Sequence, residues 1–586
     1  MAAYDDVMAK PPRVMTAREE DIVADSMREF SQLQTWRNTF ASHWEEVAEL
    51  VLPTSRNTFY YGNYNWPGQK KTDRQIDSSG ALALGRFAAI CDSLLTPRNM
   101  MWHTLSADDD YVMKDRPTRL WFEQATRILF KFRYAPLANF TSQNQNNYQQ
   151  LGAFGTAGMF IDEFDNSLNP GHRGIRYRSI PLGELFLREN HQGMVDGFIR
   201  WFRMTARQAY QRWGDKIPEQ LLPALKMESE TLFNFIHRVC PRTDYDPDRL
   251  DMRGKPYASY YICLEGRALM QEGGYRMIPA AISRYEQAPQ EVYGRSPAMM
   301  VLPALKTLNA EKRVFLKAGH RAADPVLLTA DDGIVDMSMR PGALNKGGVT
   351  ADGKPLVQVL PTGQIQVTKE MMDEERQLIN DAFLVSLFQI LTESPQMTAT
   401  EVIERTNEKG ILLAPTVGRQ QSEYLGPMID RELDVLSSQG LLPPMPPRLK
   451  EARGAYQTVY TSPLSRAMRA QEAAGFIRTV ETVKELVNIT QDHSLLDPFN
   501  FDVAIPEIAD IQAVPVSWMA DDDQIKAKRK QRADQLERQQ QIQEAPAKAA
   551  MMKAEAVQAK AGIGQQPPPG QAPAQGGAPL AQQLGG

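Results

Sequence analysis

The sequence predicts an α+β protein that is mainly helical and is built from more than one structural region. Its 586 residues are too many for a single hydrophobic core, which sets the expectation of several regions. Several long stretches carry apolar residues at every third or fourth position, the spacing of a helix with one buried face. Between about residues 154 and 285 this spacing gives way to short alternating segments, which are typical of antiparallel strands.

The first strong element is a helix expected from about Thr16 to Leu52. Thr16 and Glu19 have the spacing of a capping box, which satisfies free amides at a helix start. Apolar side chains then recur along one face: Phe30, Leu33, Trp36, Phe40, Trp44, Val47 and Leu50. We interpret this stripe as core rather than as a platform for stacking bases, and Pro53 is a natural stop.

Two further helices and a strand-rich region follow. The helices are expected over Ser79–Leu95, before Thr96-Pro97, and over Pro117–Arg133. The segments GMFIDEF, GIRYRSI and GFIRWF, between residues 154 and 202, read as antiparallel strands separated by Gly, Asn and Pro. A second strand-rich stretch is expected between residues 234 and 285.

Residues 296 to 391 have the order helix, small β module, helix. The first helix is expected from Met299 or Pro303 to Arg321 and the second from Thr368 to Leu391, each roughly 30 to 36 Å long at 1.5 Å per residue. The segments PVLLTA, IVDMSM and PLVQVLP between them read as short strands. The end of the second helix, from Phe383 onward, is apolar almost all round, which predicts burial against several neighbours.

The C-terminal part is expected to be helical and then disordered. A capping box at Thr398 and Glu401 opens a helix through about Lys409, and further helices are expected over residues 419–440 and 465–489. From about residue 521 large apolar residues become rare, and KAKRKQRADQLERQQQIQ fits a solvated helix. The final segment, GIGQQPPPGQAPAQGGAPLAQQLGG, has too little apolar surface to order itself.

Composition limits the possible classes of protein. The formal net charge of -5 lacks the positive excess of proteins that wrap DNA, so any DNA contact would be loose or would use a local basic surface. The three cysteines match no metal-ligand spacing, which suits assembly in a reducing cytoplasm. The first residues, MAAYDDVMAK, lack the apolar core of a signal peptide, and the longest apolar run is about half the roughly 20 residues that cross a bilayer. We therefore expect a soluble protein without membrane spans.

One motif imitates a nucleotide site. Gly348 to Lys354 (GVTADGK) matches the phosphate-binding loop up to its last position, but Pro355 stands where Ser or Thr should bind the metal. Proline also disfavours the helical conformation of the preceding residue, where a helix should begin. We interpret this segment as a Gly-rich turn.

Other patterns for catalysis are absent or are better explained by structure. The seven histidines are scattered without a metal-binding spacing, and the acidic triplets at residues 108–110 and 521–523 fit solvated loops. Gly152, Gly155 and Gly158 do not form the dinucleotide fingerprint, and we interpret them as sites of close backbone packing or a turn. We therefore expect no enzymatic activity, no cofactor and no metal site.

Six segments, in this order and spacing, resemble the portal protein (head-to-tail connector) family of short-tailed bacteriophages, the podoviruses. They are WRNTFASHWEEVAELVLP (36–53), IDSSGALAL with LLTP (76–97), NF with LGAFGTAG (139–158), GMVDGFIRWFRMTARQ (193–208), YGRSPAMMVLPALKTLN (293–309) and TATEVIERTNEKGILLAP (398–415). The resemblance covers roughly residues 25 to 465. It implies a ring of subunits, expected to be a dodecamer, with a wing, a stem, a clip and a crown.

The resemblance implies a layout of the chain. Its parts would be a wing with N-terminal helices and a β-rich part (1–295), a first stem helix (296–322), a clip (323–367), a second stem helix (368–391), a tunnel loop (392–397), wing or crown helices (398–445), a crown (446–520), and a polar helix with a disordered tail (521–586). Whether a C-terminal barrel forms is left open.

The implied function is a ring-shaped DNA channel at the unique capsid vertex, for genome packaging, head-tail joining and DNA ejection. The implied partners are copies of the chain, double-stranded DNA bound non-specifically, the terminase large subunit, capsid and scaffolding proteins, and tail adaptor or nozzle proteins. The protein would be made in the host cytoplasm and reside in the virion. The alternatives are the packaging-motor ATPase and another structural or scaffold protein of the virion.

The first stem helix carries the candidates for a DNA-facing surface. At 100° per residue, Lys306, Arg313, Lys317, His320 and Arg321 fall within an arc of about 100°, which we call the basic stripe. The stripe would face passing DNA or acidic residues of the neighbouring subunit. The alternative is a solvated helix face whose late basic residues favour the helix dipole.

Two acidic or polar segments complete the candidate residues. Glu370, Asp373, Glu374 and Glu375 begin the second stem helix, where acids stabilise a helix start and could also pair with the basic stripe of an adjacent subunit. The segment Thr392, Glu393, Ser394, Pro395 and Gln396 would be the tunnel loop by its position in the family. Composition alone favours a plain turn between helices.

Overall fold

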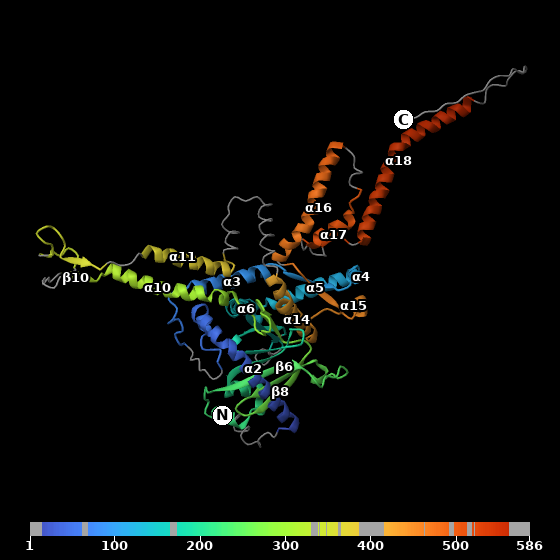
Figure 1. Ribbon diagram of the computed structural model, residues 1–586. Coiled ribbons are helices and arrows are strands. Elements are labelled where there is room, and N and C mark those ends of the chain that lie inside the picture. Colours follow the sequence, from blue (N-terminus) through green and yellow to red (C-terminus); the bar gives the residue numbers. More distant parts are fainter. Residues whose placement is uncertain are drawn as a thin grey trace, which may run out of the picture. The chain divides into compact units, whose positions relative to one another are not determined.

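The computed structural model describes residues 15–60, 68–164, 171, 173–329, 338, 340–346, 348–360, 365–385, 415–461, 463–490, 497–511, 518–520 and 522–561. The chain forms two compact units, Met1–Val514 and Pro515–Gly586. Helices predominate and all the described strand pairs are antiparallel, so the predicted α+β class is confirmed (Figure 1).

Helices and strands alternate along the chain. The helices, in chain order, are α2 (Ala17–Leu50), α3 (Ser79–Leu95), α4 (Asp110–Met113), α5 (Arg116–Arg133), α6 (Phe140–Phe154), α7 (Ala206–Trp213), α8 (Leu222–Lys226), α9 (Pro297–Met300), α10 (Leu302–Ala323), α11 (Ile365–Ala382), α14 (Gly426–Ser438), α15 (Pro447–Glu451), α16 (Pro463–Thr490), α17 (Phe501–Ile511) and α18 (Asp522–Ala561). The strands are β1 (His103–Ala107), β2 (Thr156–Glu163), β3 (Ile175–Ile180), β4 (Leu185–Glu189), β5 (Val195–Thr205), β6 (Leu232–Pro241), β7 (Tyr257–Cys263), β8 (Ala268–Tyr275), β9 (Ala280–Arg284), β10 (Leu327–Thr329), β11 (Val357–Val359) and β12 (Tyr456–Tyr460).

Helix α2 starts where its sequence predicts, and one residue of its predicted apolar face is exposed. Thr16 is the N-cap, and both halves of the capping box with Glu19 are formed. Trp44 is fully buried, but Trp36 is 65% exposed, so its expected place in the core was wrong. The first half of α2 packs in one core through Leu33 and the second half in another through Trp44, and Trp36 lies between these two contacts.

A five-stranded antiparallel sheet, in the order β4-β5-β6-β7-β8, is covered on both faces. Alternate residues of each strand point to opposite faces of a sheet, which is why one strand can serve two cores. Ile199 and Trp201 of β5 join the first half of α2, whereas Phe202 joins Trp213 of α7. The β-rich stretches expected on both sides of residue 206 thus both contribute strands to this sheet.

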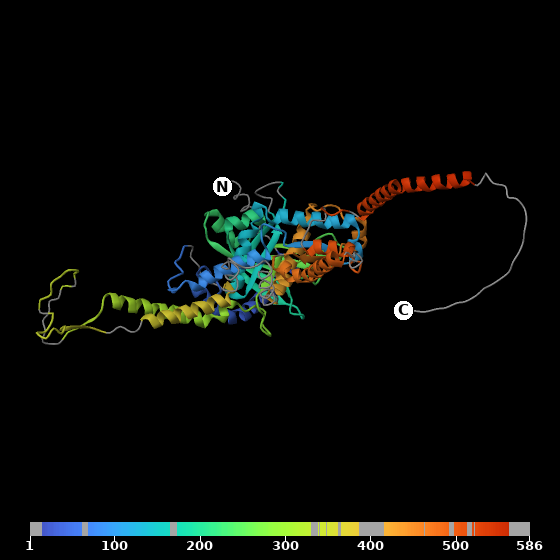
Figure 2. The ribbon, with the colours of Figure 1, turned by 90° about the horizontal axis from the view of Figure 1, so that it is seen from above.

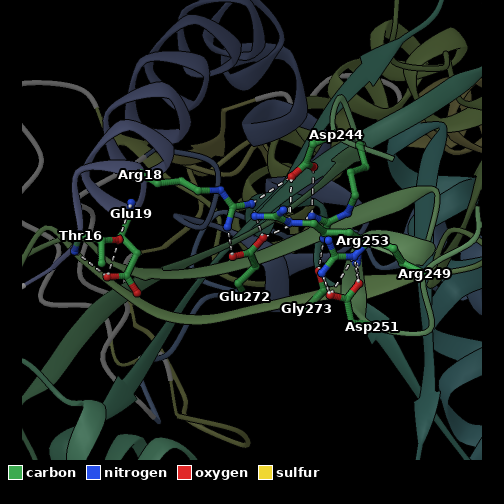
Figure 3. A network of polar contacts seen from close by, with 10 residues as sticks. Thr16, Arg18, Glu19, Asp244, Arg249, Asp251, Arg253, Glu272 and Gly273 are labelled. Atoms are coloured by element: carbon green, nitrogen blue, oxygen red, sulfur yellow. Dashed lines mark hydrogen bonds and ion pairs between the residues drawn. The ribbon is translucent and has the colours of Figure 1, made fainter. Parts of the chain in front are cut away.

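An ion-pair network ties the start of α2 to this sheet (Figure 3). The Arg18 guanidinium lies 3.1 Å from Asp244 and 3.0 Å from Glu272 of β8. Arg242 binds the same two carboxylates at 3.3 and 3.2 Å. Burial alone would raise the pKa of Asp244, but the hydrogen bond and charge of Arg242 outweigh it and lower the pKa below its ordinary value.

A second, three-stranded sheet in the order β3-β2-β9 lies between the largest cores. Helix α6 packs against β2 and β3 and was not expected from the sequence. Its segment, FTSQNQNNYQQLGAF, is polar, yet Asn144, Asn147 and Gln150 are buried. Two of these side-chain amides are held by hydrogen bonds: Asn144 donates to Asp92 and Gln150 donates to Ser179. The spacing of apolar residues in the sequence gives no sign of such bonds.

The three glycines spaced at three residues serve close packing and a turn, as interpreted from the sequence. A Cβ on Gly152 would lie 2.7 Å from the Phe87 ring. Gly155 ends α6 with a φ of +74°, and a Cβ there would lie 2.4 Å from the carbonyl oxygen of Gly294. Only glycine satisfies both the left-handed conformation and this backbone-to-backbone approach.

Replacing Gly155 by alanine is expected to lower the free energy of unfolding by more than about 2 kcal/mol, since strain and a backbone clash add. The matched control is Gly440→Ala, where φ is +67° and a Cβ would meet nothing within 4 Å. That control should cost only the conformational strain, about 1 kcal/mol. Thermal melting of both variants measures the difference, and equal losses would refute the role of the Gly294 contact.

The expected second long helix is shorter than predicted. Helix α11 ends at Ala382, and Phe383 and Leu384 form a turn in which Leu384 has a φ of +61°. The apolar sequence from Phe383 predicted burial, and Phe383 in this turn and Val385 directly after it are both buried. Residues 386–391 of the predicted helix lie outside the described residues. The predicted helix over 398–409, most of IVDMSM and the predicted disordered tail lie outside the described residues.

The later helices match their predicted positions, but several later elements were missed, among them α15. Helix α16 covers the expected 465–489 segment, and the expected 419–440 helix contains a π-helical stretch, Gln420–Leu425, before α14. Strand β12 pairs with β1 across more than 300 residues of sequence, and α17 was not expected. Among the described residues, no helix is both long and apolar enough to cross a membrane.

Candidate functional site: the α10–α11 helix pair

Helices α10 and α11 lie side by side and form the helix pair, which contains most of the candidate residues (Figures 1 and 2). Strands β10 and β11 follow α10 and precede α11 in the chain. They pair antiparallel with Leu327 opposite Val359. The predicted order of helix, small β module and helix is therefore present.

The first turns of α10 and the last turns of α11 are anchored in the largest core. Leu302, Leu305 and Leu308 of α10 are buried there with Ile379 of α11. Gly80 at the start of α3 permits this packing, since a Cβ on it would lie 2.6 Å from the Leu305 side chain. The helix pair is thus fixed at one end by apolar contacts.

Polar contacts fix the same end. Asn309 of α10 accepts hydrogen bonds from the backbone amides of Ile76 and Asp77, at 2.8 and 3.2 Å. Arg376 of α11 donates to Asp77 at 3.0 Å. Burial would raise the pKa of Asp77, but hydrogen bonds from Ser79 and Arg376 outweigh it and lower the pKa. Asp77 therefore ties both helices to the segment before α3.

Replacing Asp77 by alanine is expected to cost about 1–2 kcal/mol at neutral pH, because Arg376 and the Ser79 amide lose a charged partner. Since the folded-state pKa is lowered, the carboxylate stabilises the fold above its unfolded pKa, and this stabilisation is lost as pH falls through the folded pKa. The gap between wild type and variant in thermal melts should therefore close on acidification. Asp373→Ala removes a more exposed partner of Arg376 and should cost less; a gap independent of pH would contradict this role for Asp77.

The basic stripe is exposed along its whole length. Lys306, Arg313, Lys317, His320 and Arg321 all lie on the solvent-accessible side of α10. Lys306 forms an ion pair with Glu46 of α2 at 2.6 Å, and both side chains are about half exposed. Within the described part of the chain, the other four have no ion pair. Two exposed apolar residues, Val314 and Leu316, flank the stripe on either side of the helix.

The four acidic candidates of α11 have different surroundings. Glu370 and Glu374 are exposed on the side of α11 away from the buried Met372 and Ile379. Asp373 pairs with Arg376 at 2.8 Å in the same helix. Glu375 lies near Glu311 of α10, and burial, followed by the charge of Glu375, raises the pKa of Glu311. Glu370 and Glu374 thus present the acidic surface of the pair.

Apolar side chains remain uncovered on the helix pair and its β module. Val314, Leu316, Met371 and Leu378 are between 44% and 59% exposed. The β module adds further exposed residues: Val326, Leu328, Leu344, Val349, Leu356, Val359 and Leu360. Clustered exposed apolar residues of this kind mark contact surfaces.

The imitation of a phosphate-binding loop is a turn, as interpreted from the sequence. Val349 bridges to Pro355, and the Thr350 amide donates to the Lys354 carbonyl at 2.8 Å. Gly353 has a φ of +76°, and the residues after it lead into β11 rather than into a helix. The segment therefore lacks the helix N-terminus on which phosphates bind.

The other sequence candidates add no second site. The Asp109 carboxylate caps α4 by accepting from the Tyr111 amide at 2.8 Å. Among the residues that the structure describes, no group of three potential metal ligands occurs. The tunnel-loop candidates Thr392 to Gln396 lie outside the described residues, so their role stays a prediction.

The family model described as "Bacteriophage head to tail connecting protein" matches residues 24–519. The chain belongs to this family. Two curated members of similar sequence come from bacteriophages. One, from Bordetella phage BPP-1 and named "Probable portal protein", is 28% identical over 532 residues, or 87% of this chain and 91% of that protein. The other, from Salmonella phage epsilon15 and named "Portal protein", is 27% identical over 526 residues, with the same two coverages.

Among solved structures, this head-to-tail connecting protein matches a chain titled "Neck of empty GTA particle computed with C6 symmetry". The match has a TM-score of 0.30 and 11% identity, and covers 64% of this chain and 84% of that one. The family membership therefore comes from sequence, and it agrees with the resemblance seen in the six segments.

Proposed function

We propose that this head-to-tail connecting protein is a portal protein, a structural subunit of the virion that forms a DNA-conducting ring at one vertex of a bacteriophage capsid. The observation that carries the proposal is the family match over residues 24–519, together with two relatives named as portal proteins. The helix pair supports it, because its uncovered apolar residues need a partner surface that a neighbouring subunit supplies.

The charges on the helix pair fit a head-to-tail contact between copies. The basic stripe lies on one side of α10, and Glu370 and Glu374 lie on the outer side of α11. A heterologous interface joins two different surfaces and closes into a ring when the rotation per subunit divides the circle. In such a ring, one flank of the stripe, at Val314 or at Leu316, would meet α11 of the next copy, and the centre of the stripe would be left towards the channel.

The finer assignments extend this proposal. The helix pair would be the stem, β10 with β11 the clip, and Thr392 to Gln396 the tunnel loop. DNA would be bound non-specifically. The terminase large subunit, capsid and scaffolding proteins, and tail adaptor or nozzle proteins would dock on the ring. The ring would guide DNA without hydrolysing nucleotide itself.

The competing function is the packaging-motor ATPase. The turn at Gly348 to Pro355 speaks against it, since it has neither the Ser or Thr for the metal nor a following helix. A scaffold protein is disfavoured by the five-stranded sheet, because scaffolds are expected to be mainly helical and polar.

The proposal is tested by native mass spectrometry of the purified full-length chain. A closed assembly is expected, because the proposed head-to-tail interface forms a ring when the rotation per subunit divides the circle. The family resemblance sets the expected number at about twelve copies. A variant with Val314→Asp and Leu316→Asp should shift the mass towards monomers, whereas Met227→Asp, at an exposed position away from the helix pair, should leave the ring intact. A monomeric wild type, or nucleotide hydrolysis by the purified chain, would refute the proposal.

A further inference from the structure

A cleft of about 800 Å³ between the two sheets is lined by arginines from three elements. Arg176 and Arg178 come from β3, Arg200 and Arg203 from β5, and Arg212 from α7. The acidic residues of the lining are Asp162 and Glu163. We call this feature the arginine cleft. It is a local basic surface in a chain whose overall charge is negative.

The guanidinium groups in the cleft are only partly neutralised. Arg200 is buried and binds Glu184 at 2.9 Å. Arg178 and Arg212 are exposed, and among the described residues no carboxylate lies within ion-pairing distance of either. Burial, followed by the charge of Arg200, lowers the pKa of Arg178. The charge of Glu184 opposes this shift, and the charge of Arg212 adds to that of Arg200. An anion in the cleft would offset the repulsion among these three arginines.

The cleft holds these groups in place. The Arg212 guanidinium lies 4.3 Å from the centre of the Tyr261 ring, and the Arg200 guanidinium lies 5.1 Å from the centre of the Phe202 ring. Arg176 donates to the Leu137 carbonyl at 2.6 Å. Planar, stacked guanidiniums match the geometry of phosphate oxygens and lose little freedom on binding them.

We propose that the arginine cleft binds phosphate groups of a nucleic-acid backbone, through Arg178 and Arg212. The inference rests on the proposed function, in which the protein meets DNA, but it places a contact outside the helix pair. The cleft is assembled from one chain, so binding there does not need the ring.

The lining favours a nucleic-acid backbone over an acidic peptide. The aromatic rings of Phe160, Phe202 and Tyr261 are at least 91% buried, so they offer little surface to peptide side chains. Gln208 and Gln211 add hydrogen-bonding groups without sequence preference. Contacts to a nucleic-acid backbone require several positive charges and hydrogen-bonding groups, and they do not require pockets for side chains.

An adjoining cleft supplies a matched control. It shares Arg212 with the arginine cleft, but its own basic residues, among them Lys255 and Arg276, are balanced by acids such as Asp251 and Asp434. Arg276, for example, lies 4.0 Å from Asp434. The excess of positive charge is therefore confined to the arginine cleft. Variants at Lys255 and Arg276 measure the effect of losing two positive charges close to that cleft but outside it.

The test is fluorescence anisotropy of a labelled duplex DNA titrated with the full-length chain at several salt concentrations. Arg178→Ala with Arg212→Ala is expected to weaken binding about tenfold at low salt and to make the salt dependence shallower, by roughly 0.9 in slope for each phosphate that is no longer neutralised. Lys255→Ala with Arg276→Ala should leave both values near wild type. Thermal melts should show no loss for Arg178→Ala, because removing it relieves repulsion.

Unchanged duplex binding in the Arg178/Arg212 variant would overturn the inference. So would binding of an oligoglutamate peptide that depends on these arginines while duplex binding does not, which would assign the cleft to an acidic protein segment. These outcomes are separate from failure of the proposed function, which native mass spectrometry detects as loss of the closed ring.

Discussion

Replacing Glu432 by alanine is expected to destabilise the chain by about 3–5 kcal/mol, because it leaves the charge of Arg133 buried without a partner. Both side chains of this pair are fully buried. Arg133 of α5 donates from Nε to Glu432 of α14 at 3.0 Å, and the Tyr177 hydroxyl donates to the same carboxylate at 2.6 Å. The loss should appear as a lower thermal midpoint and a lower yield of soluble protein.

The rings around Arg133 do not compensate for the lost carboxylate. The guanidinium lies 4.6 Å from the Trp102 ring centre and 4.8 Å from that of Phe130. Such cation–π contacts contribute about 1–2 kcal/mol, less than the expected loss.

Two controls isolate the effect of the buried charge. Glu123→Ala removes an acid that pairs with Arg127 in the same helix at a partly exposed position, and should cost less than about 1 kcal/mol. Arg133→Met combined with Glu432→Leu removes both charges and should recover much of the stability. If Glu432→Ala melts like wild type, or if the double variant is as unstable as the single one, the pair does not join α5 to α14 in this way.

Reversing two charges of the basic stripe, Lys317→Glu with Arg321→Glu, is expected to reduce packaged DNA by about tenfold or more. If the stripe lines the channel as proposed, the reversal inverts the local potential felt by the phosphates. Both residues are exposed and distant in sequence from the anchored start of α10. Folding and ring assembly should therefore persist. The measurement is nuclease-protected DNA per assembled head.

The matched control reverses two exposed charges elsewhere, Arg28 of α2 and Lys226 of α8. It should leave packaging near wild type. Virions of the stripe variant that package and retain DNA normally would show that the stripe has no channel role. Loss of the ring in that variant would instead assign the stripe to pairing with Glu370 and Glu374 of the neighbouring subunit.

Local chemistry made much of the fold predictable. The capping box at Thr16 and Glu19 defined the start of α2, and Thr96-Pro97 defined the end of α3, because both signals act within a few residues. The alternation of apolar and polar residues between 154 and 285 predicted most of the strands correctly. Such alternation arises because one face of a strand is buried and the other is exposed. Local chemistry also showed that the segment ending at Pro355 is a turn and not a nucleotide-binding loop.

Features that depend on distant residues could not be predicted. Arg133 and Glu432 are 299 residues apart in sequence, and neither position is distinguished by its neighbours. The arginine cleft combines β3, β5 and α7, whose individual arginines read as ordinary solvent-facing residues of strands and a helix. The polar helix α6 was missed because hydrogen bonds, rather than an apolar stripe, hold its buried side.

The most direct test is an electron-microscopy class average of the purified full-length chain, viewed along the symmetry axis. The proposed portal predicts a closed ring of about twelve subunits whose central opening is lined by α10 and α11. Separate monomers, or a ring whose opening is lined by the five-stranded sheet with the helix pairs on the outside, would contradict it.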